Sequence, residues 1–337
     1  MFSTPSLSPK NLDPSPSIGG KAQKVFKEMF ENVCQTVEKI DGNSFTQHFW
    51  MRDKNGNLKL TTDSNAAVYV DRSLHNGNLF EKIGVNYVAI NGNLPPGMTF
   101  QKSGALETKE ADLTNSNGST PYFATGASFV IHPYNPMIPT AHANYRYFQI
   151  GHDKRPNFWW FGGGADLTPS YLFEEDAVHF HRVHKEVCDK HDSSYYDRFK
   201  KWCDDYFFIK HRDETRGIGG IFFDQLNDRD PEEILGFVKD STEAFVPAYM
   251  PIVERRKDSS FTEENKYWQR IVRGRYVEFI LTSDRGVHFG LEGGMVSPQS
   301  VFNCMAPEAS WKYDDTPLPG SKEAVLREVL SNPRKWV

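Results

Sequence analysis

Short apolar runs after residue 126 limit the fold of this chain more than any other feature. Several of them alternate apolar and polar residues, and a period of two over about four to eight residues is typical of strands. We predict strands at residues 127–132, 144–150, 158–162, 218–223, 275–281 and 287–291. The runs are spaced like hairpin partners, so the strands are expected to form a mostly antiparallel sheet.

Apolar residues at helical spacing mark the other elements. Residues 21–40 carry such a stripe. Asp230 before Pro231 and two glutamates is the pattern of a helix N-terminus, and Pro247 and Pro251 are expected to kink or end that helix. Further helices are predicted at residues 170–190, 261–272 and 321–330. Grouped helices together with hairpin-like strand pairs predict the α+β class.

The N-terminal segment and the overall composition limit the setting of the protein. Residues 1–20 are rich in serine and proline and resemble neither a secretory signal nor a mitochondrial presequence, so we interpret them as a disordered tail before one domain at 21–337. No apolar run reaches the ~18 residues of a membrane span. The four cysteines form no CxxC pair, which favours a reducing compartment and predicts a cytoplasmic location. The net charge of −5 argues against a nucleic-acid partner.

Motifs for common cofactors are absent from the sequence. There is no GxGxxG after a strand, no GxxxxGK loop, no HExxH and no GxSxG, so nothing indicates a nicotinamide or a flavin. The tripeptide Gly162-Gly163-Gly164 follows an apolar run, and we interpret it as a close backbone approach rather than a phosphate loop. Residues 166–169 are expected to form a turn or a helix cap.

A group of polar residues begins one of the predicted strands. Asn144 and Arg146 are two positions apart and therefore share one face of the strand. An amide and a guanidinium on one face can grip a carboxylate together, because arginine supplies a bidentate fork. His142 stands at the entrance of the same strand, where it could exchange a proton.

Several histidines lie on a predicted helix. His181, His184 and Cys188 recur at helical spacing, and His132 and His211 would complete a set of metal-ligand types. Histidines on such a helix more often cap, stack or bridge to carboxylates. We therefore favour a structural role and keep a divalent metal site as the alternative.

A third polar group lies near the C-terminus. In strand geometry Arg275 would point with apolar residues, which is costly unless a carboxylate meets it. Asp284-Arg285-Gly286 follows. It is either an ordinary hairpin turn or a charged pair that faces a pocket.

These segments carry a resemblance to a known family. FVIHPYNPMIPTAHANYRYF, FWWFGGGADLTPSYLFEEDAVHFHR, RFKKWCDDYFFIKHRDETRGIGGIFFDQLN and RGRYVEF, followed by DRGVHFGL, resemble the oxygen-dependent coproporphyrinogen III oxidases in order and in approximate spacing. The resemblance implies a large, mostly antiparallel sheet between helices. It implies that two propionates of coproporphyrinogen III become vinyl groups in haem synthesis, with O₂ as acceptor and H₂O₂ as product. It also implies a homodimer and no required cofactor, although a divalent metal has been attributed to part of the family.

The resemblance also assigns residues. His142 matches a proton donor, and Asp284 and Arg285 match an acid–arginine pair beside the tetrapyrrole. Residues 275–294 match a dimer-forming region. Met295 and Ile280 depart from the family, which often has arginine and asparagine at these positions. Substrate contacts are expected at Ser128, Asn144, Tyr145, Arg146, Arg275, Gly293 and Gly294, and the candidate metal ligands are His132, His142, His181 and His211.

Overall fold

The fold is organised around one eight-stranded antiparallel sheet with strand order β10-β7-β6-β5-β4-β3-β1-β2. The computed structural model describes residues 17–53, 57–94, 120–152, 155–292 and 296–337. The strands of the sheet are β1 (Thr46–Arg52), β2 (Leu58–Thr61), β3 (Tyr69–His75), β4 (Phe80–Leu94), β5 (Thr120–Pro133), β6 (Thr140–His152), β7 (Arg155–Thr168) and β10 (Gly219–Leu226). A separate two-stranded pair is formed by β8 (Phe208–Ile209) and β9 (Glu214–Thr215).

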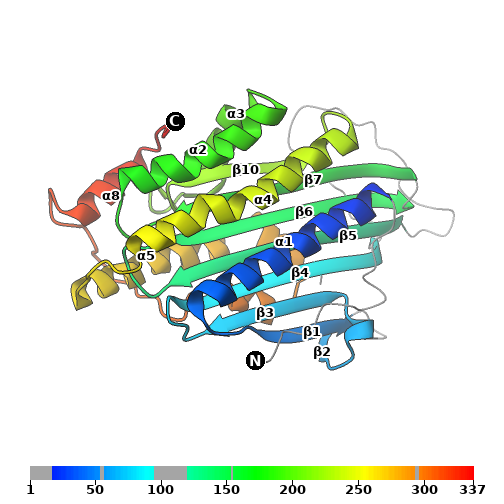
Figure 1. Cartoon of the computed structure of the whole chain (residues 1–337), viewed down its shortest axis with the longest axis horizontal. Coiled ribbons are helices and arrows are strands. Elements are labelled where there is room, and N and C mark those ends of the chain that lie inside the picture. The colour runs from blue at the N-terminus through cyan, green and yellow to red at the C-terminus, as the bar shows by residue number, and fades with distance from the viewer. Residues whose placement is uncertain (1–16, 54–56, 95–119, 153–154, 293–295) are drawn as a thin grey trace.

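Helices lie on both faces of this sheet (Figure 1). Contacts place α1 and α4 against the middle strands on one face, with α2 packed on α4 and α3 on β10, while α7 contacts β3 and β4. The helices are α1 (Ile18–Asp41), α2 (Glu174–His191), α3 (Tyr195–Tyr206), α4 (Pro231–Arg256), α5 (Glu263–Thr282), α6 (Arg285–Glu292), α7 (Pro298–Asn303) and α8 (Lys322–Ser331). The predicted α+β class with a mostly antiparallel sheet is confirmed.

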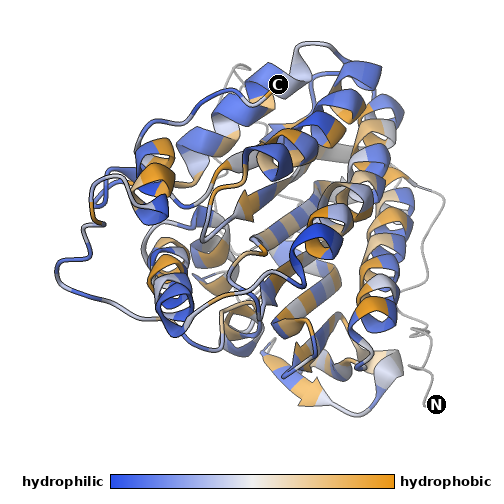
Figure 2. Cartoon of the chain, turned by 60° about the vertical axis from the view of Figure 1, so that its left-hand side comes forward, coloured by the Kyte–Doolittle hydropathy of each residue, from blue (hydrophilic) through white to orange (hydrophobic). Residues whose placement is uncertain are grey.

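The main core fills the space between the sheet and the helices α1, α2 and α4. Phe26 and Phe30 come from the predicted stripe of α1 and are fully buried. Phe129 of β5 meets Phe245 of α4 edge to face, with ring centroids 4.5 Å apart. Figure 2 shows the sequence pattern that produces this core: hydrophobic and hydrophilic residues alternate along the strands and helices. Among the described residues no helix combines the length and apolarity needed to cross a membrane.

The two predicted strands nearest the C-terminus are wrong. Residues 275–281 belong to α5, and residues 287–291 belong to α6. A capping box between Thr262 and Asn265 starts α5, and the helix then propagates through the apolar run that sequence alone could not assign. Gly274 within this helix allows a close crossing, because a Cβ there would lie 2.5 Å from the Ser310 carbonyl oxygen.

The ends of two further elements differ from those that the sequence favours. The helix α4 begins after its cap Asp230, as predicted, but it ends at neither Pro247 nor Pro251 and continues to Arg256. Its packing against α1, α2, β6 and β7 compensates for the backbone hydrogen bonds that the prolines cannot donate. The predicted turn at residues 166–169 is also displaced, because β7 continues through Thr168.

Candidate active site

A cavity of about 700 Å³ opens on the sheet face opposite α1 and α4. Its floor is formed by residues of β4, β5, β6, β7 and β10, and its walls by the end of α3 and by α5, α6 and α7. This volume lies within the range of about 300–1,000 Å³ that small-molecule sites occupy. The predicted polar residues can contact a bound small molecule only if their side chains reach this cavity.

The strand β6 brings three of them into the cavity. His142, Asn144 and Arg146 all line it, because side chains two apart project from the same face of a strand. Ser128 lies on β5 directly opposite Asn144 in the register and also lines the cavity. The predicted group of histidine, amide and guanidinium is thus assembled on one surface.

Tyr145 borders the cavity, but its side chain lies on the other face of the sheet. It is fully buried, and its hydroxyl donates to the Ser241 carbonyl of α4 at 3.3 Å. The alternation that exposes Asn144 and Arg146 to the cavity turns the residue between them away from it. Tyr145 therefore stabilises the core and does not offer its hydroxyl to a ligand in the cavity.

His142 is held by a buried ion pair that sequence reasoning missed. Its Nδ1 lies 2.7 Å from Asp166 Oδ1, and Arg216 Nη2 lies 2.6 Å from Asp166 Oδ2. Arg216 is only 1% exposed, and its guanidinium lies 4.0 Å from the Phe207 ring centroid. Burial alone would raise the pKa of Asp166, but Arg216 and His142 hold that pKa below its ordinary value. An ionised carboxylate only accepts, so Nδ1 of His142 carries a proton and Nε2 remains for exchange with a ligand.

Arg146 is also fixed from two sides. It donates from Nη1 to Asn144 Oδ1 at 3.1 Å, and its Nη2 pairs with Asp224 Oδ1 of β10 at 2.9 Å. Gly162 of β7 leaves room for this pair, because a Cβ there would lie 2.9 Å from Arg146 Cζ and 2.8 Å from Asp224 Oδ1. The interpretation of the glycine run as a close approach is confirmed at this position.

Asp284 and Arg285 lie on the cavity wall at the start of α6. Both line it, and Asp284 Oδ1 accepts hydrogen bonds from the Tyr206 hydroxyl at 3.0 Å and from the backbone N–H groups of Gly286 and Val287 at 2.9 and 3.1 Å. Asp284 is therefore the N-cap of α6, and residues 284–286 do not form a hairpin turn. Burial and then the neighbouring Asp284 raise the pKa of Tyr206, so its hydroxyl stays protonated and donates.

A family model described as Coproporphyrinogen III oxidase matches residues 21–336. The chain belongs to the coproporphyrinogen III oxidase family. Coproporphyrinogen-III oxidase 1, chloroplastic, of Arabidopsis thaliana is 44% identical over 96% of this chain and 80% of its own length. The mitochondrial oxygen-dependent enzyme of Homo sapiens is 44% identical over 94% of this chain and 67% of its own length. The oxygen-dependent enzyme of Francisella tularensis is 41% identical over 94% of this chain and 98% of its own length.

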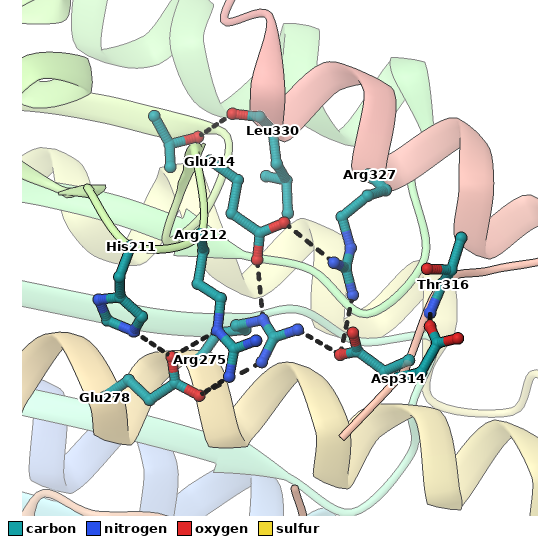
Figure 3. A network of polar contacts seen from close by, with 11 residues as sticks. His211, Arg212, Glu214, Arg275, Glu278, Asp314, Thr316, Arg327 and Leu330 are labelled. Carbon is teal, nitrogen blue, oxygen red and sulfur yellow. Dashed lines mark hydrogen bonds and ion pairs between the residues drawn. The ribbon is translucent and has the colours of Figure 1, made fainter. Parts of the chain in front are cut away.

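Arg275 is not among the residues that line the cavity. The carboxylate that the sequence required for it is supplied by the protein, as Figure 3 shows. Arg275 donates to Glu214 Oε1 at 2.9 Å and to Glu278 Oε1 at 3.2 Å, and it also pairs with Asp315. Arg327 of α8 joins the same network through Glu214 at 3.2 Å. These contacts join α5, α8 and the β8–β9 pair.

The four candidate metal ligands each have separate partners among the described residues and do not gather at a common site. His132 Nε2 lies 3.0 Å from the Cys304 carbonyl oxygen, and burial lowers the pKa of His132 to about 3. His181 contacts the Tyr196 hydroxyl at 2.9 Å, and His211 contacts Glu278 at 2.7 Å. Within the part of the chain that the structure describes, no group of three or more metal-ligating side chains occurs. The structural interpretation of the helix histidine His181 is the one that its contacts support.

The family resemblance singles out four further positions. Gly293 and Gly294, predicted to contact substrate, lie outside the described residues, as does Met295. Ile280, which replaces the asparagine frequent in the family, lines the cavity. Its side chain makes that part of the wall apolar.

Asp71 of β3 is a buried carboxylate next to the cavity wall. It accepts hydrogen bonds from Trp50 Nε1 at 2.8 Å and Ser300 Oγ at 2.7 Å. Burial raises the pKa of Asp71 to about 7 from an ordinary 3.8, and the two neutral donors offset this only in part. Between these pH values the folded chain binds a proton that the unfolded chain has released, so stability falls as the pH rises through this window.

This pKa gives a testable result for stability. We expect Asp71→Asn to unfold at a higher temperature than the wild type at pH 8 and to lose that advantage at pH 5, where the wild-type carboxyl is protonated. Thermal unfolding of both proteins at the two pH values measures the difference. An offset that does not change with pH would contradict the raised pKa.

Proposed function

We propose that this protein is an oxygen-dependent coproporphyrinogen III oxidase that converts two propionates of its substrate to vinyl groups and yields protoporphyrinogen IX. For each side chain, the propionate, one O₂ and one proton give a vinyl group, CO₂ and H₂O₂, so the substrate carbon is oxidised and O₂ takes both electrons. The observation that carries the proposal is the row His142, Asn144 and Arg146 facing Asp284 and Arg285 across one cavity. No resident cofactor has a role in this proposal.

The arginines orient the substrate in this account. Arg146 on the floor and Arg285 on a wall of the cavity supply charge-assisted hydrogen bonds to propionate carboxylates. Asp284 Oδ1 is occupied by three donors, which fixes the carboxylate and leaves Oδ2 to accept a pyrrole N–H. Accepting that proton makes the macrocycle more electron-rich and able to reduce O₂.

His142 supplies the proton for the reduced oxygen. The ionised Asp166 accepts the hydrogen bond from Nδ1 and so fixes the tautomer of the imidazole, and Arg216 keeps Asp166 ionised. A proton on Nε2 can then pass to the peroxide that forms beside the β-carbon of the propionate. The apolar wall around Phe207 and Ile280 limits the access of water to this step.

The experiment that tests the function is an assay in air of the purified, EDTA-treated protein with coproporphyrinogen III, followed by protoporphyrin fluorescence. We expect product at the same rate with and without EDTA. Loss of product that added metal restores would favour the alternative, a metal-dependent enzyme that uses the histidines. Tight porphyrin binding without product under any condition would favour a non-catalytic tetrapyrrole-binding relative.

We also propose that the protein acts as a homodimer through the α5–α7 side. The large apolar residues Leu281, Leu291 and Phe302 of these helices are exposed in the single chain, and the family resemblance places dimer contacts at residues 275–294. Light scattering is expected to give twice the chain mass for the wild type and a smaller mass for Leu281→Asp. The control Leu60→Asp changes an equally exposed leucine on β2 and should remain dimeric. A monomeric wild type would contradict the proposal.

The cytoplasmic location is likewise proposed. It is supported by Cys34, Cys188, Cys203 and Cys304, which are all free thiols and suit a reducing compartment. Relatives from plants and mammals carry the words chloroplastic or mitochondrial in their names. Fractionation of the source cells tests the point, and recovery of the protein with an organelle would contradict it.

A further inference from the structure

Arg146 already has a carboxylate partner before any substrate is present. Its Nη2 lies 2.9 Å from Asp224 Oδ1, and the two side chains are 34% and 26% exposed. Both residues line the cavity. On the other side, Asn144 Oδ1 accepts a hydrogen bond from Arg146 Nη1 at 3.1 Å. The guanidinium is therefore held in place, while some of its five N–H groups remain for a ligand.

The backbone around Asp224 is shaped to aim this carboxylate. The pairing of β10 with β7 is irregular between Phe223 and Leu226. Gln225 has a φ of 47°, a backbone conformation that residues other than glycine rarely adopt. Asp224 Oδ1 also accepts the Gln225 N–H at 2.9 Å. Irregularities of this kind re-aim a side chain and gather at functional sites. The aspartate is therefore positioned toward Arg146 by strand geometry.

The charges in the cavity imply that the Asp224 carboxylate opposes the binding of an anionic substrate. Among its described lining residues the full charges are Arg146, Arg285, Asp224 and Asp284, with His142 as a further titratable group. A substrate with four carboxylates would bind more tightly if Asp224 were neutral, since like charges oppose each other. A carboxylate that weakens substrate binding needs a role in a later step.

We propose that Asp224 is the resident counter-ion of Arg146, which one propionate of the substrate displaces and which takes the guanidinium back when that propionate has lost its carboxylate as CO₂. The inference rests on the proposed function and adds a substrate–product discrimination to it. While substrate is bound, Arg146 Nη2 is paired with the propionate. Once the side chain is a neutral vinyl group, Asp224 restores the ion pair and the product has no hold on this arginine.

The test compares binding of two porphyrins to wild type and Asp224→Asn by fluorescence titration. Coproporphyrin III, with four carboxylates, should bind to the variant about fivefold more tightly, the ratio expected for loss of a competing, partly exposed ion pair. Protoporphyrin IX, with two carboxylates, should bind to both proteins equally. The KM for coproporphyrinogen III should fall while kcat does not rise, a combination that general structural damage does not produce.

Two controls isolate the pair. Asp189→Asn removes the same charge from an exposed partner of Lys185 on α2, and it should leave both affinities and turnover unchanged. In an Arg146→Gln background, Asp224→Asn should no longer tighten coproporphyrin binding.

Each remaining outcome contradicts the inference in a different way. Equal tightening of both porphyrins would mean that Arg146 holds a propionate that survives the reaction, which overturns the exchange. No tightening, or weaker binding of both, would make Asp224 a structural residue. A wild type that binds neither porphyrin and makes no product would overturn the proposed function itself.

Discussion

Asp284→Asn is expected to lower kcat by roughly 100-fold or more, the usual size of a lost general acid–base group. The asparagine can still accept hydrogen bonds from Tyr206 and from the two backbone N–H groups that Asp284 Oδ1 accepts, so the start of α6 is preserved. Only the negative charge and the proton acceptor are removed. The KM should change much less than kcat, and the melting temperature should stay close to that of the wild type.

The alanine variant separates the chemical role from the structural one. Asp284→Ala should lose activity to the same extent and, in addition, about 1 kcal/mol of stability because the helix cap is gone. Asp230→Ala removes a comparable cap from α4 without touching the cavity, and it should lose stability but keep kcat. Near-normal turnover by Asp284→Asn would remove Asp284 from the mechanism.

Asp166→Asn is expected to be the most damaging single change in stability, because it leaves the fully buried Arg216 without its anion. Breaking a buried ion pair by removing one partner costs about 3–5 kcal/mol, and chemical denaturation measures this loss. The kcat of the folded variant should also fall roughly 100-fold or more, since the neutral amide no longer fixes the tautomer of His142.

Two matched variants distinguish these effects. Asp176→Asn breaks another nearly buried pair, with Arg256 at 2.7 Å on the helix-covered side, and should destabilise the fold while leaving kcat unchanged. Adding Arg216→Met to Asp166→Asn should recover stability but not turnover. Recovery of turnover in the double variant would show that Asp166 acts only through the fold.

The sheet and part of the site could be predicted from sequence because they depend on local periodicity. The apolar runs in β5, β6, β7 and β10 identified real strands, and the two-residue spacing of Asn144 and Arg146 placed both in the cavity. The same spacing already separated Tyr145 from them, and only the family resemblance suggested its substrate contact.

The remaining parts depend on contacts between distant segments. The sequence pattern at residues 166–169 favours a turn and gives no sign of Asp166 as a site residue, whereas the β6–β7 register places Asp166 directly opposite His142. Arg216 and Asp224 come from a separate part of the chain, and no local pattern linked them to β6. Arg275 was assigned to a strand near the substrate because a short apolar run fits a strand or a helix equally well.

The most direct test of the central claim is product formation by the wild-type protein from coproporphyrinogen III in air and under argon. We expect protoporphyrinogen IX with release of two CO₂ per molecule in air, and no product under argon until O₂ is admitted. Equal product formation without O₂, or no product in air from protein that is folded and binds the porphyrin, would contradict it.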